Sequence, residues 1–372
     1  MNDTLKYYSL LVNSNMILTS IKVHTDVREY VLDNLRPVTI LTSTTPSGKS
    51  TLLRVLYDFL VSVDRIFAPI QNVDRVDISL KIPDEATEKL RKKYSRKWDV
   101  ELEDWDGNVK IVKNFQHNHK EFILYVDNEI VFHAVQRLSE DEVITSIRRP
   151  VSIDLKTDTD SIGELYHIIC KTPQAQLFSE YEELLLLGSE FCKDVLQYLK
   201  DNVKVYLIGP YIDYGTCADP VSIADEHYVG RHGENTILVL ASLFTDGRVW
   251  PELAQLISTL EKMGIKRLRC GYRSGKIALS CLTKHNELVV CPELPCSVKV
   301  LITYYTQLLA LPKYSIVLID NFDYCMYGDT CQAIAKFIRN VVTRKKCQLI
   351  VELHNKDLVK CLVSEYSVLV TI

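Results

Sequence analysis

The sequence lacks any long run of apolar residues. No stretch approaches the ~20 residues that a helix needs to span a bilayer, and the opening segment MNDTLKYYSLL has neither the apolar region nor the cleavage site of a signal peptide. We therefore expect a cytoplasmic protein without a membrane partner. Apolar residues still make up 47% of the 372 residues and charged residues 25%, so the chain can bury a sizeable core.

Cysteine is missing from the first part of the chain, since none of the 11 cysteines precedes Cys170. No C-x-x-C pair occurs, which argues against a zinc site. Cys291/Cys296 and Cys325/Cys331 are close in sequence, but in a reducing cytosol we expect free, buried thiols; intracellular disulfides are a feature of hyperthermophiles. The net charge of −4 argues against a protein that coats nucleic acid, yet permits local basic patches.

The most informative stretch runs from residue 38 to residue 60. A β-type apolar run ends in small polar residues, then come Ser47-Gly48-Lys49-Ser50-Thr51 and apolar residues at helical spacing. A strand, a loop with Gly-Lys-Ser and a helix are the context of a phosphate-binding P-loop. There Lys49 would reach the β- and γ-phosphates of ATP and Ser50 would hold Mg²⁺, while backbone N–H groups cradle the phosphates.

This loop departs from the usual G-x-x-x-x-G-K-S/T pattern. Ser43 stands at the place of the first glycine, where a positive φ is often required, and Pro46 removes one N–H group from the cradle. A bare Gly-Lys-Ser also occurs in ordinary strand–turn–helix units. The P-loop assignment therefore depends on residues elsewhere in the chain.

Two further predicted strands end in residues with useful chemistry. The buried-type run of residues 314–319 ends at Asp320, and the run of residues 348–353 ends at His354. In an open α/β sheet, ligands bind beyond the carboxyl ends of the strands. Asp320 fits the Walker B role of holding Mg²⁺, and His354 fits a switch residue that faces the γ-phosphate. Each alone is equally well a capped strand end, but together, in this order, they predict one nucleotide site.

Residues 89–98 form a basic segment, with six Lys or Arg residues and two aromatic residues in ten positions. Such a segment can grip a nucleic-acid backbone. The alternative is a solvated helix end, because Asp84, Glu85 and Glu88 precede it. DNA is therefore one expected partner, and a protein effector is the other.

With these residues in view, the sequence resembles the ABC-type ATPase heads of the SMC/RecF/OLD group, especially the compact AAA-like members without a long coiled coil. The resemblance covers most of the chain and is weakest from residue 70 to residue 200. Two single residues carry the resemblance: Ser297, 23 residues before Asp320, stands at the place of the signature-motif serine, and His354 stands at the place of the switch histidine. The segments that carry it are residues 35–41, 205–210, 229–235 and 320–323.

The resemblance implies an α/β P-loop fold with a parallel-dominated central sheet, an antiparallel β flap and an inserted helical subdomain. It also implies a homodimer that forms through bound nucleotide. We expect one composite head over residues 1–372, with a P-loop and β-rich lobe over 1–160, a helical insertion over 161–202, and a signature, Walker B and switch part over 203–372.

Three of the four nucleotide motifs nevertheless depart from the family pattern. Besides the altered P-loop, Val298 and Lys299 replace the signature glycines, and Asn321 replaces the catalytic glutamate after Asp320. An amide cannot accept a proton from the attacking water, and the loss of a general base costs about 10²–10⁴ in rate. A Q-loop glutamine is not identifiable.

The resemblance thus implies an ATP-binding, ABC-type ATPase-like protein with weak or absent hydrolysis that acts as a nucleotide-dependent switch or scaffold, with ATP and Mg²⁺ as cofactors. The alternative is an active, dimerising ATPase in DNA repair, chromosome maintenance or phage defence. A transporter subunit ranks third, since that family keeps an intact LSGGQ motif. The expected catalytic residues are Asp320, Asn321 and His354, and the nucleotide-binding residues are Ser47, Gly48, Lys49, Ser50, Thr51 and Ser297.

Overall fold

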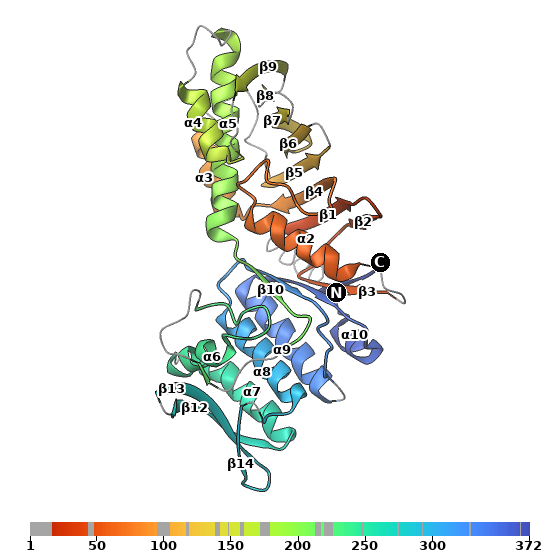
Figure 1. The fold of residues 1–372 in the computed structure, drawn as a ribbon, viewed down its shortest axis with the longest axis vertical. Helices are drawn as coiled ribbons and strands as arrows, with labels where there is room; N and C mark the ends of the chain where they lie inside the picture. The colour runs from red at the N-terminus through yellow and green to blue at the C-terminus, as the bar shows by residue number, and fades with distance from the viewer. Residues whose placement is uncertain are drawn as a thin grey trace, which may run out of the picture. The chain divides into compact units, whose positions relative to one another are not determined.

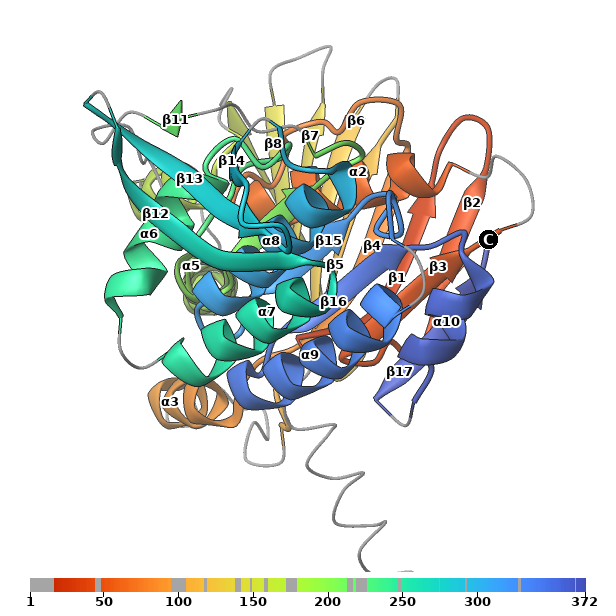
Figure 2. The ribbon, with the colours of Figure 1, turned by 90° about the horizontal axis from the view of Figure 1, so that it is seen from below.

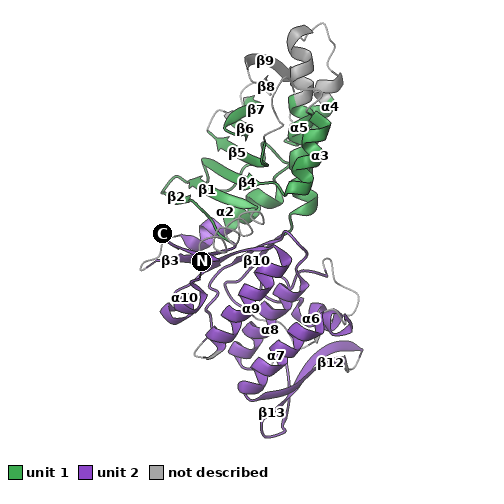
Figure 3. Ribbon diagram, turned by 180° about the vertical axis from the view of Figure 1, so that it is seen from behind, with its two compact units in different colours: residues 1–36, 54–204 green, residues 37–53, 205–372 purple. Residues whose placement is uncertain are grey.

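A computed structural model describes most of the chain. The described residues are 17–43, 48–94, 105–116, 119–137, 142–147, 149–156, 160–171, 179–212, 217–218, 226–246, 249–273, 275–291, 293–326, 329–364 and 366–372. The chain forms two compact units, residues 1–36 with 54–204 and residues 37–53 with 205–372 (Figure 3). Helix α2 (Lys49–Val61) begins in the second unit and continues in the first. Within the described part, no helix is long and apolar enough to cross a membrane.

The first unit is built on an antiparallel sheet of eight strands, in the order β2-β1-β4-β5-β6-β7-β8-β9 (Figure 1). The tight turn at Asp127 and Asn128, both with positive φ, joins β6 to β7 as the hairpin pattern requires. The strands are β1 Leu18–His24, β2 Glu29–Leu32, β4 Arg75–Lys81, β5 Asn108–Phe115, β6 His119–Val126, β7 Glu129–Arg137, β8 Glu142–Ile147 and β9 Arg149–Lys156.

The described part of the first unit also contains the helices α3 (Asp84–Tyr94), α4 (Ile162–Lys171) and α5 (Ser179–Asn202). Helix α5 packs against α4 and against β7 and β8. Its Phe191 meets the rings of Tyr94 and Trp105 edge-on, with centroid distances of 5.1 and 5.6 Å. The predicted helical region is therefore present as α4 and α5; its separation as an inserted subdomain stays a prediction.

A buried cation lies within the first unit. Lys113 on β5 is fully buried, and its Nζ donates hydrogen bonds of 2.9 Å to the carbonyls of Ser62 and Arg65, just beyond the end of α2. The ammonium also lies 4.8 Å from the centre of the Phe59 ring. Burial lowers the pKa of Lys113 to about 7. The side chain thus fastens the end of α2 to β5.

The second unit contains a five-stranded parallel sheet in the order β10-β15-β16-β3-β17. Every residue of β15 and β16 is buried, as strands covered on both faces require. The predicted α/β fold with a parallel sheet and a separate antiparallel sheet is confirmed. The strands are β3 Val38–Thr42, β10 Val205–Ile208, β15 Ile316–Ile319, β16 Gln348–Glu352 and β17 Ser367–Thr371.

Helices cover this parallel sheet, and a small antiparallel sheet packs on two of them. Helices α7, α8 and α9 lie side by side (Figure 2), and α6 also contacts α8. Strands β12 and β13 pack against α6, and β12 also packs against α7. The helices are α6 Thr236–Thr245, α7 Trp250–Lys262, α8 Cys296–Ala310, α9 Asp329–Lys345 and α10 Lys356–Leu362, and the strands of the small sheet are β11 Cys217–Ala218, β12 Ile265–Arg273, β13 Lys276–Thr283 and β14 Leu288–Val290.

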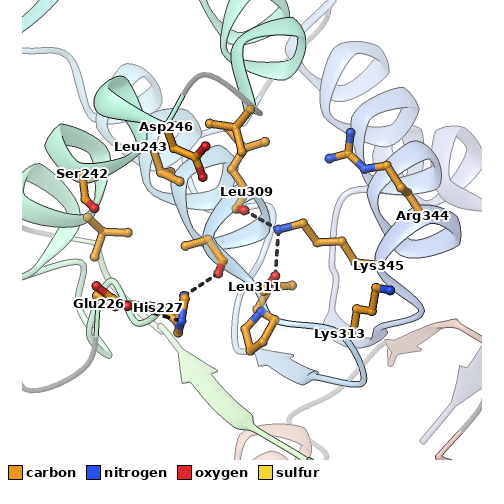
Figure 4. A pocket seen from close by; sticks show the side chains of 14 residues that line it. Glu226, His227, Ser242, Leu243, Asp246, Leu309, Leu311, Lys313, Arg344 and Lys345 are labelled. Atoms are coloured by element: carbon orange, nitrogen blue, oxygen red, sulfur yellow. Dashed lines mark hydrogen bonds and ion pairs between the residues drawn. The ribbon is translucent and has the colours of Figure 1, made fainter.

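A pocket of about 620 Å³ lies at the carboxyl end of α8 (Figure 4). Lys345 Nζ donates hydrogen bonds to the carbonyls of Leu309 and Leu311, and His227 Nδ1 donates to the carbonyl of Ala310 at 2.9 Å. These two side chains satisfy carbonyls that the end of a helix leaves without partners. We interpret the pocket as part of the structure that caps α8.

Candidate functional site

The candidate P-loop lies between β3 and α2. Gly48 has a φ of 75°, which only glycine adopts without strain, and α2 begins at the next residue. Lys49 is only 3% exposed. Its Nζ donates a 2.5 Å hydrogen bond to Ser43 Oγ and lies 3.3 Å from Glu352 Oε1. The serine at the place of the first P-loop glycine therefore holds the lysine head.

Three oxygen-bearing side chains converge next to this lysine. Ser50 Oγ donates to Asp320 Oδ1 at 2.9 Å and lies 3.2 Å from Glu352 Oε2. Asp320 follows β15 and Glu352 ends β16, and β16 pairs with both β15 and β3. Because parallel strands end at the same edge of a sheet, these residues meet although some 300 positions separate the first from the last in sequence.

The two carboxyl groups share a buried position, with Asp320 6% and Glu352 5% exposed. Burial, together with the hydrogen bond to Glu352, raises the pKa of Asp320 to about 7, although Ser50 and Arg231 act in the opposite direction. Burial also acts to raise the pKa of Glu352, but the hydrogen bond with Asp320 and the charge of Lys49 outweigh it and lower that pKa. A proton bound to the pair therefore lies mainly on Asp320.

Glu352 was not among the expected site residues. Its signal in the sequence is weak. Glu352 is the last residue of β16, two residues before His354, and it follows the apolar residues that come after Gln348 in this strand. Such a residue normally turns into solvent. Only the packing of β16 between β3 and β15 shows that this carboxylate faces Lys49 and Ser50.

His354 joins the site through Glu352. Its Nε2 lies 3.2 Å from Glu352 Oε1, and its imidazole is 53% exposed. Asp323 fixes the backbone beyond β16, since its Oδ2 accepts hydrogen bonds from the backbone N–H groups of His354, at 2.7 Å, and of Asn355. Asp323 is therefore occupied as a backbone anchor. Asn321 follows Asp320 in the left-handed conformation, with a φ of 55°.

The remaining expected site residues are not all brought together. Thr51 is exposed on the first turn of α2, and Ser47 lies outside the described residues. Ser297 sits in the first turn of α8, half-buried, and among the described residues it makes no hydrogen bond or ion pair with the strand-end cluster. The role of Ser297 therefore stays a prediction.

The two middle segments that carry the family resemblance, residues 205–210 and 229–235, meet behind Asp320. Gly209 N donates to the carbonyl of Arg231 at 2.8 Å, and Arg231 Nε donates back to the carbonyl of Gly209 at 3.3 Å. Gly209 has a φ of 100°, and a Cβ there would lie 2.2 Å from the carbonyl oxygen of Asp320. Glycine is therefore required where this loop passes the strand end.

The donor set fits a magnesium nucleotide. Ser50, Asp320 and Glu352 offer only hard oxygen donors, which suit Mg²⁺. Within the part of the chain that the structure describes, no group of three or more His, Cys, Asp or Glu side chains is placed to hold a metal. Mg²⁺ in phosphate sites is bound by one or two side chains together with water and phosphate oxygens, which fits this donor set. The N-terminus of α2 and Lys49 supply donors for the phosphates.

No protein-family model and no curated protein matches the sequence. Solved structures of SMC head domains are similar to it over 93% of its length. The SMC head bound to the C-winged helix domain of ScpA has 11% identity and a TM-score of 0.45, with 91% of that chain covered. The SMC head of Thermotoga maritima has 11% identity, a TM-score of 0.40 and 92% coverage.

The Smc head domain with an extended coiled coil, bound to the C-terminal domain of ScpA from Pyrococcus furiosus, has 10% identity, a TM-score of 0.39 and 92% of that chain covered. At these values the similarity carries no functional argument.

Proposed function

We propose that this chain binds ATP with Mg²⁺ at the carboxyl edge of its parallel sheet and acts as an ABC-type ATPase-like switch or scaffold with slow hydrolysis. One observation carries the proposal: Lys49, Ser50, Asp320 and Glu352 form a single buried cluster at the start of α2. A buried cation opposite two carboxylates, beside a helix N-terminus, is an arrangement that a Mg²⁺–phosphate group can enter without leaving a charge unpaired.

Each side chain has a defined part in this proposal. Lys49 would exchange its contact with Glu352 for phosphate oxygens, and Gly48 lets the backbone approach them. Ser50 and Asp320 would hold the Mg²⁺ ion, which when bound neutralises charge on the phosphate oxygens. Asp320 must lose its proton to do so. Glu352, released from Lys49, then has the hydroxyl of Ser50 as its neighbour, 3.2 Å away in this structure.

The slow turnover in this proposal follows from Asn321, whose amide cannot deprotonate water. Glu352 supports a second candidate function, an active dimerising ATPase in DNA repair, chromosome maintenance or phage defence. Its carboxylate can accept a proton, and His354 at 3.2 Å can fix its orientation. The two candidates therefore differ in whether Glu352 takes over the role of the missing base.

Two partners are proposed for such a switch. One is a second copy of the chain, bound through nucleotide and Ser297, and the other is an effector. Three cations of the basic segment have intramolecular partners. Arg91 donates to the carbonyl of Trp105, Lys92 pairs with Glu88 at 2.6 Å, and Lys93 pairs with Glu190 and Asp194 at 2.7 Å each. Residues 95–98 of that segment lie outside the described residues. The ion pairs favour a protein effector over DNA.

A nucleotide titration tests the proposal. A fluorescent ATP analogue should bind the wild-type protein in Mg²⁺, and Lys49→Ala should weaken binding about 100-fold, the value of a hydrogen bond between charged groups. Lys336→Ala, which removes an exposed lysine from α9, is the matched control and should bind like wild type. No binding by the wild type, or equal binding by Lys49→Ala, would show that the P-loop survives only as a turn.

A further inference from the structure

One segment of the second unit carries charge of a single sign. Residues 262–284 contain seven Lys or Arg residues and neither Asp nor Glu, although the whole chain has a net charge of −4. The segment begins at the last residue of α7 and supplies β12 and β13, which pair as antiparallel strands. Positive charge is therefore concentrated on one pair of strands.

These two strands have one covered face and one open face. Strand β12 packs against α6 and α7, and β13 packs against α6 (Figure 2). Leu279 and Cys281 of β13 belong to the core that these helices form. Residues at alternate positions point to the opposite face of a strand pair. A Cβ at Gly271, on that opposite face, would meet nothing within 4 Å, so the face is open there.

The open face carries the cations. The register of β12 with β13 puts Lys266, Arg269 and Lys276 on this face, and all three are exposed. Arg267, between the first two, and Lys284, just beyond the end of β13, are exposed as well. Among the described residues, Lys266, Arg267, Arg269 and Lys284 form no ion pair. Their charges are therefore available to a ligand.

The chemistry of the open face favours nucleic acid over a protein partner. Charged residues are depleted in the centre of protein–protein interfaces, whereas interfaces with nucleic acid are strongly positive. An acidic peptide could instead add a strand to β12, which is the last strand of its sheet. The register of β12 shifts between Lys266 and Arg269, however, and such an irregularity makes an edge a poor template for pairing.

The dimensions of β12 suit a duplex. A residue of an antiparallel strand advances about 3.4 Å, which equals the advance of about 3.4 Å per phosphate along one DNA strand. The nine residues of β12 therefore extend about 30 Å, alongside about nine base pairs. Single strands are bound largely by stacking on aromatic rings, and none of the described side chains of the open face is aromatic.

We propose that the open face of β12 and β13 binds the phosphate backbone of double-stranded DNA, with Lys266 and Arg269 as its central contacts. Contacts to phosphates fix the position of a duplex without reading its base sequence. Residues 91–93, by contrast, have intramolecular partners for their cations. Duplex DNA is thus a partner in addition to the effector of the proposed switch, and its binding does not require ATP.

Fluorescence anisotropy of a labelled DNA duplex of about 20 base pairs, about twice the length of β12, tests the inference on the full-length protein. Omitting ATP keeps the result independent of the proposed nucleotide site. The double variant Lys266→Gln/Arg269→Gln removes two phosphate contacts and keeps polar side chains. Counterion release then predicts a slope of log K against log salt that is about 1.8 shallower, and binding about 60-fold weaker at 0.1 M salt.

The double variant Lys336→Gln/Arg339→Gln is the matched control. It removes one Lys and one Arg at the same spacing from exposed positions of α9, and it should bind the duplex like wild type. Equal binding by wild type and Lys266→Gln/Arg269→Gln would overturn the inference and leave these cations as protection of the free edge of β12. Circular dichroism checks that each variant is folded.

Two competing polyanions complete the test. Polyglutamate and vesicles that contain phosphatidylserine should bind less tightly than the duplex at the same salt concentration. Tighter binding of polyglutamate would assign the open face to an acidic protein, and tighter binding of the vesicles would assign it to a membrane surface. Either result, or no binding of the duplex by the wild type at low salt, would overturn the inference.

Discussion

Two buried lysines, one in each unit, have contrasting surroundings. Lys49 in the second unit is 3% exposed and Lys113 in the first is fully buried. Lys49 faces the carboxylate of Glu352 and the hydroxyl of Ser43. Lys113 has two backbone carbonyls and an aromatic ring, and burial lowers its pKa to about 7. Burial of a cation therefore does not by itself identify a functional site.

The two lysines differ in the kind of partner that each one contacts. A side-chain carboxylate such as Glu352 can turn away when a phosphate arrives, and the ligand then takes over the charge pairing of Lys49. The carbonyls of Ser62 and Arg65 belong to the backbone and cannot leave Lys113 without unfolding the end of α2. The partner of Lys49 can be exchanged for a ligand, whereas the partners of Lys113 cannot. We therefore assign a ligand role to Lys49 and a structural role to Lys113.

The largest expected effect concerns ATP hydrolysis at the cluster of Lys49, Ser50, Asp320 and Glu352. If Glu352 serves as the base, Glu352→Gln should lower steady-state ATP hydrolysis by about 10²–10⁴ while nucleotide still binds. If hydrolysis is slow because Asn321 cannot act as a base, Asn321→Glu should raise the rate instead. A phosphate-release assay on both variants separates the two candidate functions. Hydrolysis that neither substitution changes would remove both residues from the catalytic role.

The second prediction tests the fixed lysine. Lys113→Ala leaves two carbonyls without a donor and opens a cavity, so it should lower the free energy of unfolding by about 3–5 kcal/mol. Lys113→Met keeps most of the volume and should cost less, about 1–3 kcal/mol for the unpaired carbonyls. Urea unfolding followed by circular dichroism measures both values. If Lys113→Ala unfolded at the same urea concentration as the wild type, the structural role of Lys113 would be contradicted.

The third prediction uses the pH dependence of the same residue. The folded-state pKa of Lys113, about 7, lies below its ordinary value of 10.5. The stabilisation is therefore complete above the unfolded pKa and is lost as the pH falls from 10.5 through 7. Stability should rise by about 1.5 kcal/mol between pH 7 and pH 8.5 relative to Lys113→Met. Parallel pH profiles for the two proteins would show that Lys113 does not titrate in this range.

The sequence alone was sufficient for the parallel sheet but not for the structural role of Lys113. The runs of β15 and β16 are apolar throughout, and such runs predict strands buried on both faces whatever packs on them. Strand β5, by contrast, carries Lys110, whose side chain is 39% exposed, and Lys113, which is fully buried. Alternation along the strand puts Lys113 on the same face as the buried Val109 and Ile111. The local pattern does not show what its ammonium binds, because the carbonyls that accept from Lys113 come from residues 62 and 65.

Glu352 was missed for the same reason. A polar residue at the end of a buried strand is common, and the partners that make this one functional are about 300 positions away in sequence. Lys49, Ser50 and Asp320 were predictable because each belongs to a motif with a fixed local context, a loop before a helix or the end of an apolar strand. Residues that depend only on tertiary contacts leave no such pattern.

The smallest expected effect concerns Asp320 in the cluster. Its contribution to the pH dependence of stability has the opposite sign to that of Lys113. The pKa of Asp320 is raised from 3.8 to about 7. The folded state therefore favours the protonated form, and the associated stability is present below pH 3.8 and is lost as the pH rises through 7. A divalent cation at Ser50 and Asp320 would compete with that proton. Mg²⁺ should accordingly raise the melting temperature more at pH 8 than at pH 5.5.

Proton release measures this competition directly. Mg²⁺ titrated without nucleotide at pH 7, in two buffers with different ionisation enthalpies, should release about half a proton per ion bound. Omitting ATP keeps its own titration out of the measurement. Asp320→Asn keeps the size of the side chain but has no proton to lose, so its binding heat should be independent of the buffer. Buffer-independent heat in the wild type would mean that the cation does not displace the Asp320 proton, and the carboxyl pair would then resemble Lys113 as a fixed part of the fold.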